Sequence, residues 1–498
     1  MAENIFENLR LIGPELCLVF VLLGLFLSDA IFPSTKKNWF PMILTAVGCL
    51  VGAVLTCKLH TGEPTRFFAD TVASDGFAAF FRYLFFFTAV VGLYIAYGSK
   101  EIKKDERMDF ALLLVCVTFG MNLTAIASHL LVLYLGIETI SIVSFVMAGF
   151  RRNSLKSNEA SFKYLIFGAL SSGIMLYGLS LLYGFTGSLY YHEIGAFLAS
   201  RSGDVPVLLN VAMVMIYAGL AFKISAFPMH FWTPDVYEGA PTPVATFFSV
   251  GPKAAGFAAL MRITLDLFAF KFGEGQWQAV EGVGLVQSLA ILAAVTMTVG
   301  NLSAIGQNNV KRMLAYSSIA HVGYLLMGLV SLNSFGIEAV LFYFIAYCTM
   351  NLGAFWVVST VKDMTGEESI EAFRGLGWTM PVLGVCMAVF LFSLAGIPLF
   401  SGFVGKFLLF GAVVKTPGFL WLALVGIINS VVSLFYYVKI LKSMWLDKPD
   451  THTNEAALVL PTGHSIGLVA LAVPTVVLGL FFGPALVFIR QVMATFLN

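Results

Sequence analysis

Residues 223–234 read Lys-Ile-Ser-Ala-Phe-Pro-Met-His-Phe-Trp-Thr-Pro, and this stretch decides the fold because it places a lysine and a helix break inside an apolar segment. A charge at the centre of a bilayer costs roughly 2.5–3.5 kcal/mol on insertion scales. A helix broken at Pro228 frees backbone groups, which is tolerated at membrane depth only where protein or water satisfies them. The stretch therefore predicts a polar interior within the membrane and indicates an ion path.

The composition is that of a polytopic protein of the lipid bilayer. Charged residues make up 11% of the 498 residues, against about 25% in soluble proteins. Hydrophobic residues make up 59%, and the mean hydropathy is +0.88. The net charge is +1 and no basic tract is present, so nothing indicates a nucleic-acid partner. Glu3 and Glu7 precede the first apolar run, whereas a secretory signal starts with positive charge, so this run is expected to be retained as a span.

The cysteines and glycines give no sign of a cofactor. The six cysteines lie in or beside apolar segments, and no two form a C-x-x-C pair, which argues against iron–sulfur, zinc or disulfide chemistry. Neither a dinucleotide fingerprint nor a P-loop is present. We therefore expect no cofactor, no metal and no catalytic redox residue in this chain, and an energy source outside it.

Fourteen segments are candidates for membrane-spanning helices, which need about 20 apolar residues each. They are 11–32, 39–57, 76–98, 108–127, 129–150, 161–186, 206–227, 242–266, 284–303, 312–331, 336–360, 378–414 with a break near Gly396-Ile397-Pro398, 418–442, and 465–489. The fold predicted is an all-α integral membrane protein of about 14 transmembrane helices. Residues 369–377 are expected to form a short interfacial helix, and the other loops are expected to be short and ordinary.

The distribution of positive charge predicts the orientation. Lysine and arginine number fifteen in the odd-numbered loops and five in the even-numbered loops. Because cytoplasmic loops are enriched in these residues, the odd-numbered loops are expected to be cytoplasmic and both termini to lie on the outer side. This arrangement requires an even number of spans.

The breaks at Pro228 in span 7 and Pro398 in span 12 predict an internal repeat. Each has a lysine nearby, Lys223 and Lys406, and the two lie five spans apart, so the repeated units have opposite orientations. Interrupted helices in inverted repeats mark ion sites in transporters. The expected organisation is a three-helix segment at 1–107, a repeat of spans 4–8 at 108–266, an inverted repeat of spans 9–13 at 284–442, and a final span at 465–498.

Four charged residues lie deep within predicted spans: Glu138, Lys223, Lys253 and Lys406. Unpaired and facing lipid, they would together cost on the order of 10–14 kcal/mol, which exceeds the stability of many proteins. They must face the bundle interior, and some must be paired or neutral. Structural ion pairs are the alternative for each, but the four together favour proton transfer.

Polar residues also recur on single helix faces. They are Ser317, His321 and Tyr324 in span 10 and Tyr343, Tyr347 and Asn351 in span 11. Spacings of three and four place each set on one face. These residues are either interhelical hydrogen-bonding groups or a line of side chains and waters along which protons move.

His230 and Lys163 each have two interpretations. His230, in the first break, could relay protons because histidine titrates near pH 6.5, or it could cap freed carbonyls. Lys163, near the start of span 6, is either an interfacial anchor or part of a secondary proton path.

Several strings together resemble a known family. Residues 222–244 contain Phe-Lys-Ile-Ser and, further on, Val-Tyr-Glu-Gly-Ala-Pro-Thr-Pro, and Pro252-Lys253 follows them. With residues 301–321, Glu159-Ala160, Lys163-Tyr164 and residues 396–406, these strings resemble the antiporter-like membrane subunits of respiratory complex I, the NADH–quinone oxidoreductase. The form of the strings is most similar to the N-type members, and the resemblance is strong over spans 4 to 13.

The resemblance implies a non-redox, proton-translocating subunit with fourteen helices and inverted five-helix repeats. It implies that Glu138 and Lys223 form a coupling pair, that Lys253 links two half-channels, and that Lys406 is the distal lysine. His230, His321, Lys163 and Tyr324 are candidates for a secondary path. Met229 departs from the phenylalanine of many relatives, and span 5 lacks their proline after the glutamate.

The resemblance also implies an environment. FMN, iron–sulfur clusters and quinone are expected in partner subunits. The expected neighbours are K-type and M-type subunits and the lateral helix of an L-type subunit. The expected location is a bacterial inner membrane, with both termini periplasmic.

Three other functions remain open. A subunit of a multi-subunit cation/proton antiporter would share these charges but require sodium. A structural scaffold would lose assembly in step with activity when the charges are removed. A solitary solute symporter would transport when expressed alone.

Overall fold

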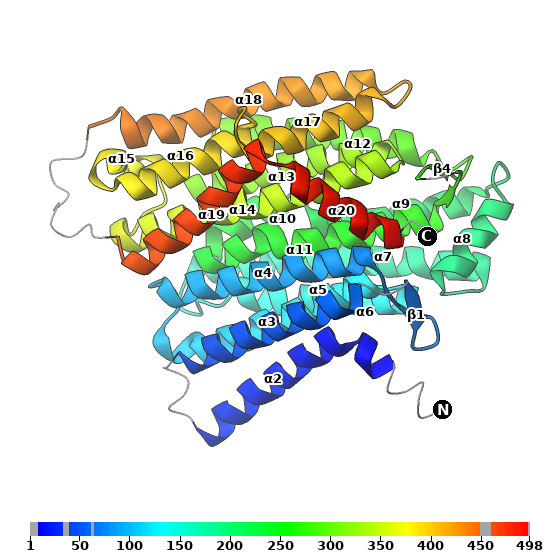
Figure 1. The fold of residues 1–498 in the computed structure, drawn as a ribbon, viewed down its shortest axis with the longest axis horizontal. Helices are drawn as coiled ribbons and strands as arrows, with labels where there is room; N and C mark the ends of the chain where they lie inside the picture. Colours follow the sequence, from blue (N-terminus) through cyan, green and yellow to red (C-terminus); the bar gives the residue numbers. More distant parts are fainter. Residues whose placement is uncertain (1–7, 33–38, 61–63, 274, 449–459, 497–498) are drawn as a thin grey trace.

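The computed structural model describes residues 8–32, 39–60, 64–273, 275–448 and 460–496, and nearly all of them are helical. Figure 1 shows the long helices lying side by side along one direction. The first half contains α2 (Gly13–Ile31), α3 (Phe40–His60), α4 (Gly76–Gly98), α5 (Arg107–Ile126), α6 (Leu130–Ala148), α7 (Leu155–Thr186), α8 (Tyr191–Ser200), α9 (Val207–Ile224), α10 (Trp232–Gly239) and α11 (Thr242–Arg262). The second half contains α12 (Leu285–Ile305), α13 (Val310–Val330), α14 (Ser334–Thr365), α15 (Leu376–Thr379), α16 (Pro381–Ala395), α17 (Ser401–Val414), α18 (Leu420–Trp445), α19 (Thr462–Leu480) and α20 (Gly483–Phe496).

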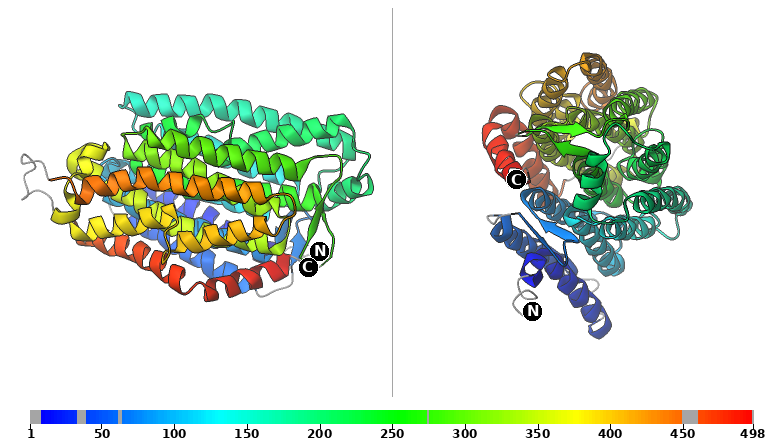
Figure 2. Two further views of the ribbon diagram at one scale, coloured as in Figure 1. Left: turned by 90° about the horizontal axis from the view of Figure 1, so that it is seen from above. Right: turned by 90° about the vertical axis from the view of Figure 1, so that its right-hand side faces the viewer.

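The predicted number of crossings is confirmed. Within the described residues, 13 helices are long and apolar enough to cross a membrane. Helix α16 gives a fourteenth crossing when it is taken together with the segment Ile370–Thr379, from which it is bent by 120°. The shorter apolar helix α17 continues from α16 across the bundle (Figure 1). The start of α2 and the end of α20 lie at the same end of the bundle, as an even number requires (Figures 1 and 2). The extreme residues 1–7 and 497–498, on which the predicted orientation of the termini also falls, lie outside the described residues.

The two ends of the bundle differ in their loops. We call the end that carries loops 99–106, 149–154, 306–309 and 366–375 the inner end, and the end with the chain termini the outer end. At the outer end lie two antiparallel hairpins, β1 (Thr65–Phe67) with β2 (Val72–Ser74) and β3 (Ala269–Lys271) with β4 (Trp277–Ala279), and helix α8. The expectation that these loops are ordinary was wrong, because three-residue strands carry too little periodicity to be recognised.

Short polar side chains define where several crossings begin. The side chains of Asp75, Ser154, Asn309 and Asn333 accept hydrogen bonds from the first turns of α4, α7, α13 and α14. Each satisfies one of the N–H groups that a helix start leaves unpaired. The start of α7 at Leu155 lies six residues before the predicted start of span 6, so Lys163 lies in the third turn of a 32-residue helix.

The first helix break is satisfied by side chains. Helix α9 ends at Ile224 because Ser225 adopts a left-handed conformation with φ of 66°. The freed carbonyl of Phe222 accepts a hydrogen bond of 3.0 Å from Trp232 Nε1, and the N–H of Phe227 donates to Thr296 Oγ1 at 3.1 Å. The predicted break is confirmed, and its backbone groups are held by protein, as burial in a membrane demands.

The second break lies between α16 and α17. Gly396 ends α16 with φ of 87°, which glycine adopts readily. The N–H of Gly402 donates to Ser393 Oγ at 3.0 Å, and a Cβ on Gly402 would lie 1.9 Å from the carbonyl oxygen of Ser393. Only glycine therefore allows α17 to begin this close to the end of α16.

The last crossing and the interfacial segment differ in detail from the prediction. Residues 465–489 were expected to form one span, but the helix ends at Leu480 and a new one begins at Gly483. Pro484 explains the division, because it has no N–H to donate and disfavours helical geometry in the residue before it. Residues 369–377 form a 3-10 turn at Ile370–Phe373 and the start of short α15.

Helices α11, α13 and α14 form the centre of the molecule and are almost wholly buried, whereas α2 and α3 leave most of their surface exposed. The central helices carry Lys253, His321 and Asn351, so these polar residues lie in the most enclosed part of the protein. The predicted boundaries of the two repeats stay a prediction.

Candidate functional site

Lys223 lies in the last turn of α9 and is 2% exposed. Its ammonium group donates to Ser141 Oγ on α6 at 2.9 Å. No ion pair within 4.0 Å joins it to Glu138 among the described residues, and Glu138 Oε1 is buried without a hydrogen-bond partner there. The predicted contact between the two charges is therefore replaced by a hydroxyl one turn further along α6. Glu138 and Ser141 offer the lysine two acceptors on one helix face.

Lys253 lies on α11, and its ammonium group donates to Ser318 Oγ on α13 at 2.6 Å. The same ammonium lies 5.4 Å from the ring centroid of Tyr237 on α10. One turn further along α11, a Cβ on Gly256 would lie 3.2 Å from Lys223 Cγ, so α11 packs directly against the Lys223 side chain. Lys253 thus lies between the first break and the central helix α13.

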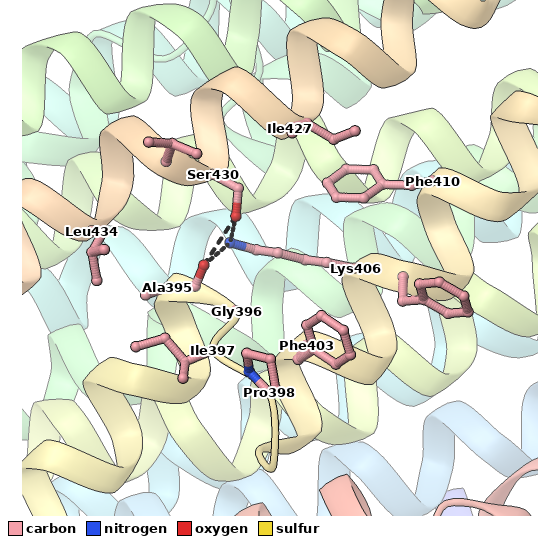
Figure 3. Close-up of a pocket in the computed structure, with 12 residues that line it drawn as sticks. Ala395, Gly396, Ile397, Pro398, Phe403, Lys406, Phe410, Ile427, Ser430 and Leu434 are labelled. Carbon is pink, nitrogen blue, oxygen red and sulfur yellow. Dashed lines mark hydrogen bonds between the residues drawn. The ribbon is translucent and has the colours of Figure 1, made fainter.

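Lys406 reaches back from α17 across the second break (Figure 3). Its ammonium donates to the carbonyl oxygens of Leu394 and Ala395 at 2.9 and 3.0 Å, and to Ser430 Oγ at 3.0 Å. These carbonyls end α16, where the helix dipole favours a positive charge. An apolar cavity of about 380 Å³ borders the lysine, and the ring of Tyr324 lies 4.6 Å from its nitrogen.

Successive turns of α13 lie between Lys253 and Lys406. Ser318 contacts Lys253, His321 follows three residues later, and Tyr324, three further on, faces Lys406. Both ring nitrogens of His321 are engaged, Nδ1 with the hydroxyl of Tyr343 at 2.5 Å and Nε2 with that of Tyr437 at 3.2 Å. The two predicted polar stripes therefore meet at His321.

The hydrogen-bonded network continues beyond His321. The Tyr437 hydroxyl also pairs with Ser317, Tyr324 accepts a hydrogen bond from Asn301, and Tyr436 donates to Asn301. Every member is buried. The hydroxyl and imidazole groups of this chain can pass protons by successive hydrogen-bond exchange, and the Asn301 amide holds the hydroxyls of Tyr324 and Tyr436.

Several buried polar atoms along this line have no hydrogen-bond partner among the described residues. They are Glu138 Oε1, Ser144 Oγ, His230 Nδ1, Tyr237 OH, Tyr347 OH and Asn351 Oδ1. Buried polar groups are normally satisfied by protein or by ordered water. Ordered water would satisfy these atoms and extend the hydrogen-bonded network.

The contacts of His230 and Lys163 bear on their two interpretations. Trp232 Nε1 donates to the freed Phe222 carbonyl, and His230 Nδ1 is buried without a hydrogen-bond partner among the described residues, so both interpretations of His230 stay predictions. Lys163 pairs with Asp235 and Glu159, each at 2.7 Å, so it belongs to an ion-pair network rather than acting as a simple lipid anchor. Arg312 contacts the same Asp235 at 2.7 Å and Glu238 at 2.9 Å.

The family follows from comparison with known proteins. Residues 127–433 match the family described as NADH:quinone oxidoreductase/Mrp antiporter, TM. NADH-quinone oxidoreductase subunit N 2 of Sorangium cellulosum is 44% identical over 97% of each chain, and subunit N of Anaeromyxobacter sp. is 41% identical over 96% of each. This chain belongs to the NADH-quinone oxidoreductase subunit N family.

Solved structures agree with membership of the subunit N family. A chain of respiratory complex I from Thermus thermophilus is 31% identical, with a TM-score of 0.78 over 95% of this chain and 98% of that one. A chain of the Mrp complex from Dietzia sp. shares the fold, with a TM-score of 0.83 over 98% and 99% of the two chains, at 21% identity.

Two groups of charged residues in this subunit N family member were not predicted from the sequence. Glu15 and Arg82 form a buried pair between α2 and α4. Glu101, Lys311, Lys362 and Glu368 form a cluster at the inner end, which we call the inner ion cluster. The sequence marks these six residues as it marks Lys223, by a charge in or beside an apolar run. They lie closer to the predicted span ends than Lys223 does.

The carboxylates of the inner ion cluster stay ionised. Burial alone would raise the pKa of Glu101, but the ammonium groups of Lys311 and Lys362 and hydrogen bonds from Lys362 and Thr242 lower it to about 2. Burial opposes ionisation of Glu368 as well, and the same two lysines hold its pKa below the ordinary value.

These lowered pKa values predict an acid dependence of stability. Each carboxylate stabilises the fold fully above the ordinary glutamate pKa of about 4.3, and this contribution is lost as the pH falls through the folded value. We expect Glu101→Gln to lower the thermal midpoint of the detergent-solubilised complex by a constant amount from pH 8 to pH 5. The difference from the wild type should shrink below about pH 4. A difference that widens in acid would contradict the assignment.

Proposed function

We propose that this chain is the proton-translocating N-type subunit in the membrane arm of an NADH–quinone oxidoreductase. The observation that carries the proposal is the set of three buried lysines, Lys223, Lys253 and Lys406. Lys253 donates to Ser318 and Lys406 lies over the ring of Tyr324, with His321 between these two residues along α13. Family membership supports the assembly. FMN, iron–sulfur clusters and quinone would belong to partner subunits, and the neighbours would be K-type and M-type subunits and the L-type lateral helix, in a bacterial inner membrane with periplasmic termini.

The proton path would run from Lys223 to Lys406. Lys223 takes a proton from the inner end, and His230 and Lys163 lie on that side as secondary groups. Lys253 receives it next, and the hydroxyls and imidazole of Ser318, His321 and Tyr324 lead it to Lys406. The second break gives Lys406 carbonyl partners that stabilise its charged form, so it is suited to be the last group before release.

Coupling would act on the acceptors of Lys223. Quinone reduction elsewhere in the complex changes the charge of a neighbouring subunit, and that change shifts the ammonium between Glu138 and Ser141. With the carboxylate as partner the lysine holds its proton, and with the neutral hydroxyl it releases the proton more easily. Helix spacing supports this step, because the two acceptors lie one turn apart, about 4.5 Å along α6.

A multi-subunit cation/proton antiporter is the second candidate, and the shared fold of the Dietzia Mrp chain favours it. The identity to subunit N proteins is about twice as high, at 44% against 21%, and supports the complex I assignment. The two candidates differ in whether sodium is required.

The test uses inside-out membrane vesicles that contain the whole complex. We expect NADH-driven proton uptake in sodium-free buffer, and we expect Lys406→Met to reduce it by about tenfold or more with assembly retained. Lys415→Met, an exposed lysine at the outer end of α17, is the matched control and should pump normally. A sodium requirement in the wild type would favour the antiporter, and normal pumping by Lys406→Met would contradict the path.

A further inference from the structure

The four residues of the inner ion cluster pair with one another, and none of them belongs to the proposed proton path. Lys311 Nζ lies 2.7 Å from Glu368 Oε1, and Lys362 Nζ lies 2.8 Å from Glu101 Oε1 and 2.5 Å from Glu368 Oε1. Arg151 adds a contact of 2.8 Å to Glu101. The side chains of Lys311, Glu101 and Glu368 are 0%, 6% and 8% exposed, so water reaches these three poorly. Lys362 is 17% and Arg151 43% exposed, so these two lie on the side of the cluster that faces out of the bundle.

The cluster joins the inner ends of both predicted repeats. Glu101 Oε2 accepts a hydrogen bond of 2.7 Å from the N–H of Thr242, the first residue of α11. Lys311, in the first turn of α13, donates to the carbonyl of Ala240 at 2.9 Å, where α10 ends. Lys362 and Glu368 come from the end of α14 and the loop after it. The contacts therefore tie α10 and α11 to α13 and α14.

The cluster lies on the inner side of Lys253, the middle lysine of the proposed path. Ser318, the partner of Lys253, is seven residues after Lys311 on α13, or about 10.5 Å deeper. On α11, Lys253 is eleven residues after Thr242, and on α14, Asn351 is eleven residues before Lys362. Seven and eleven residues are close to two and three whole turns, so each helix presents its cluster residue and its deeper polar residue on one face.

Two buried polar atoms near the deeper level lack hydrogen-bond partners among the described residues. They are Tyr237 OH and Asn351 Oδ1, which water would satisfy. Tyr237 is three residues before Ala240, which Lys311 contacts, and its ring faces Lys253. A hydrated column below the cluster would connect Lys253 to the inner end unless something closed it.

We propose that the inner ion cluster is a seal that closes the inner end of the bundle over Lys253, so that a proton on Lys253 cannot return directly to the inner side. This inference rests on the proposed function. The cluster can block protons because its charges are paired, each with at least one opposite charge within 2.8 Å. A returning proton would have to neutralise one of two carboxylates that neighbouring ammonium groups keep ionised, and would break that pairing. Lys311 and Glu368 are thus positioning residues that keep transport one-way.

The experiment measures passive proton flux in proteoliposomes that contain the whole complex. A potassium gradient with valinomycin imposes the membrane potential, and no NADH is added. We expect Lys311→Met and Glu368→Gln to raise the proton flux several-fold above the wild type. With NADH added, quinone-linked turnover should persist while protons pumped per NADH fall. Lys103→Met, which removes a 65% exposed lysine from the same end, should match the wild type.

The double variant Lys311→Met with Glu368→Gln removes one charge of each sign and leaves Lys362 paired with Glu101, so it serves as the test if the single variants fail to assemble. It should leak as the single variants do. Assembled single variants without a leak would overturn the seal, and so would a tight double variant. Loss of turnover without a leak would also overturn it, because the cluster would then supply protons instead of blocking them. Failure of the proposed function is distinguishable, because Lys223→Ala would then pump normally whatever the leak assay gives.

Discussion

Lys223→Ala is expected to abolish NADH-driven proton pumping and quinone-linked NADH oxidation while the complex still assembles. The ammonium group is buried beside the first break and held by Ser141, with Glu138 one turn away. A positioned group that exchanges protons contributes roughly 10²–10⁴-fold to a rate, so its loss should bring pumping to the background. Glu138 Oε1 already lacks a hydrogen-bond partner with Lys223 in place, so Lys223→Ala breaks no ion pair within 4.0 Å and assembly should survive.

The measurement is NADH-driven proton uptake in inside-out vesicles, with assembly verified by NADH oxidation through an artificial acceptor. Ser141→Ala is the matched control, because it removes the hydroxyl partner and keeps the ammonium and Glu138. It should retain turnover at a reduced rate. Normal pumping by Lys223→Ala would show that the lysine is structural and would contradict the path from its first step.

The sequence was sufficient to predict the breaks and the four deep charges, because both depend on local rules. Proline removes a donor wherever it stands, and a charge inside an apolar run is unfavourable whichever helix it faces. The partner of Lys223 was not predictable in the same way. Helix periodicity places Glu138 and Ser141 on one face of α6, but only the packing of α6 against α9 determines which of them the ammonium reaches.

The inner ion cluster lay beyond the reach of sequence analysis for a related reason. Its four members come from separate chain segments, and each alone resembles a charge at the end of a span, where lysine and glutamate are common. Their significance arises only because the starts of α11 and α13 and the end of α14 lie at the same level. The short hairpins at the outer end were missed for a different reason, since strands of three residues carry too little periodicity to be recognised.

Arg82→Leu is expected to have the largest effect on stability. Arg82 on α4 and Glu15 on α2 are each 1% exposed, and two parallel hydrogen bonds of 2.8 and 2.9 Å join them. Breaking such a pair from one side leaves an uncompensated buried charge, which costs about 3–5 kcal/mol. Most of the α2 surface faces outward, so this pair and the buried side chains of Leu18, Val21 and Leu25 attach α2 to the bundle. We expect a lower thermal midpoint of the purified complex and loss of α2 packing.

The double variant Glu15→Leu with Arg82→Leu separates the charge from the attachment. Replacing both members of a buried pair by apolar residues is often neutral or stabilising, since neither charge then has to be desolvated. We therefore expect the double variant to recover most of the thermal midpoint that Arg82→Leu loses. Proton pumping per NADH should be unchanged in the double variant, because the pair lies outside the line from Lys223 to Lys406. A double variant as unstable as Arg82→Leu would show that the geometry of the bidentate contact, and not the unpaired carboxylate, holds α2 in place.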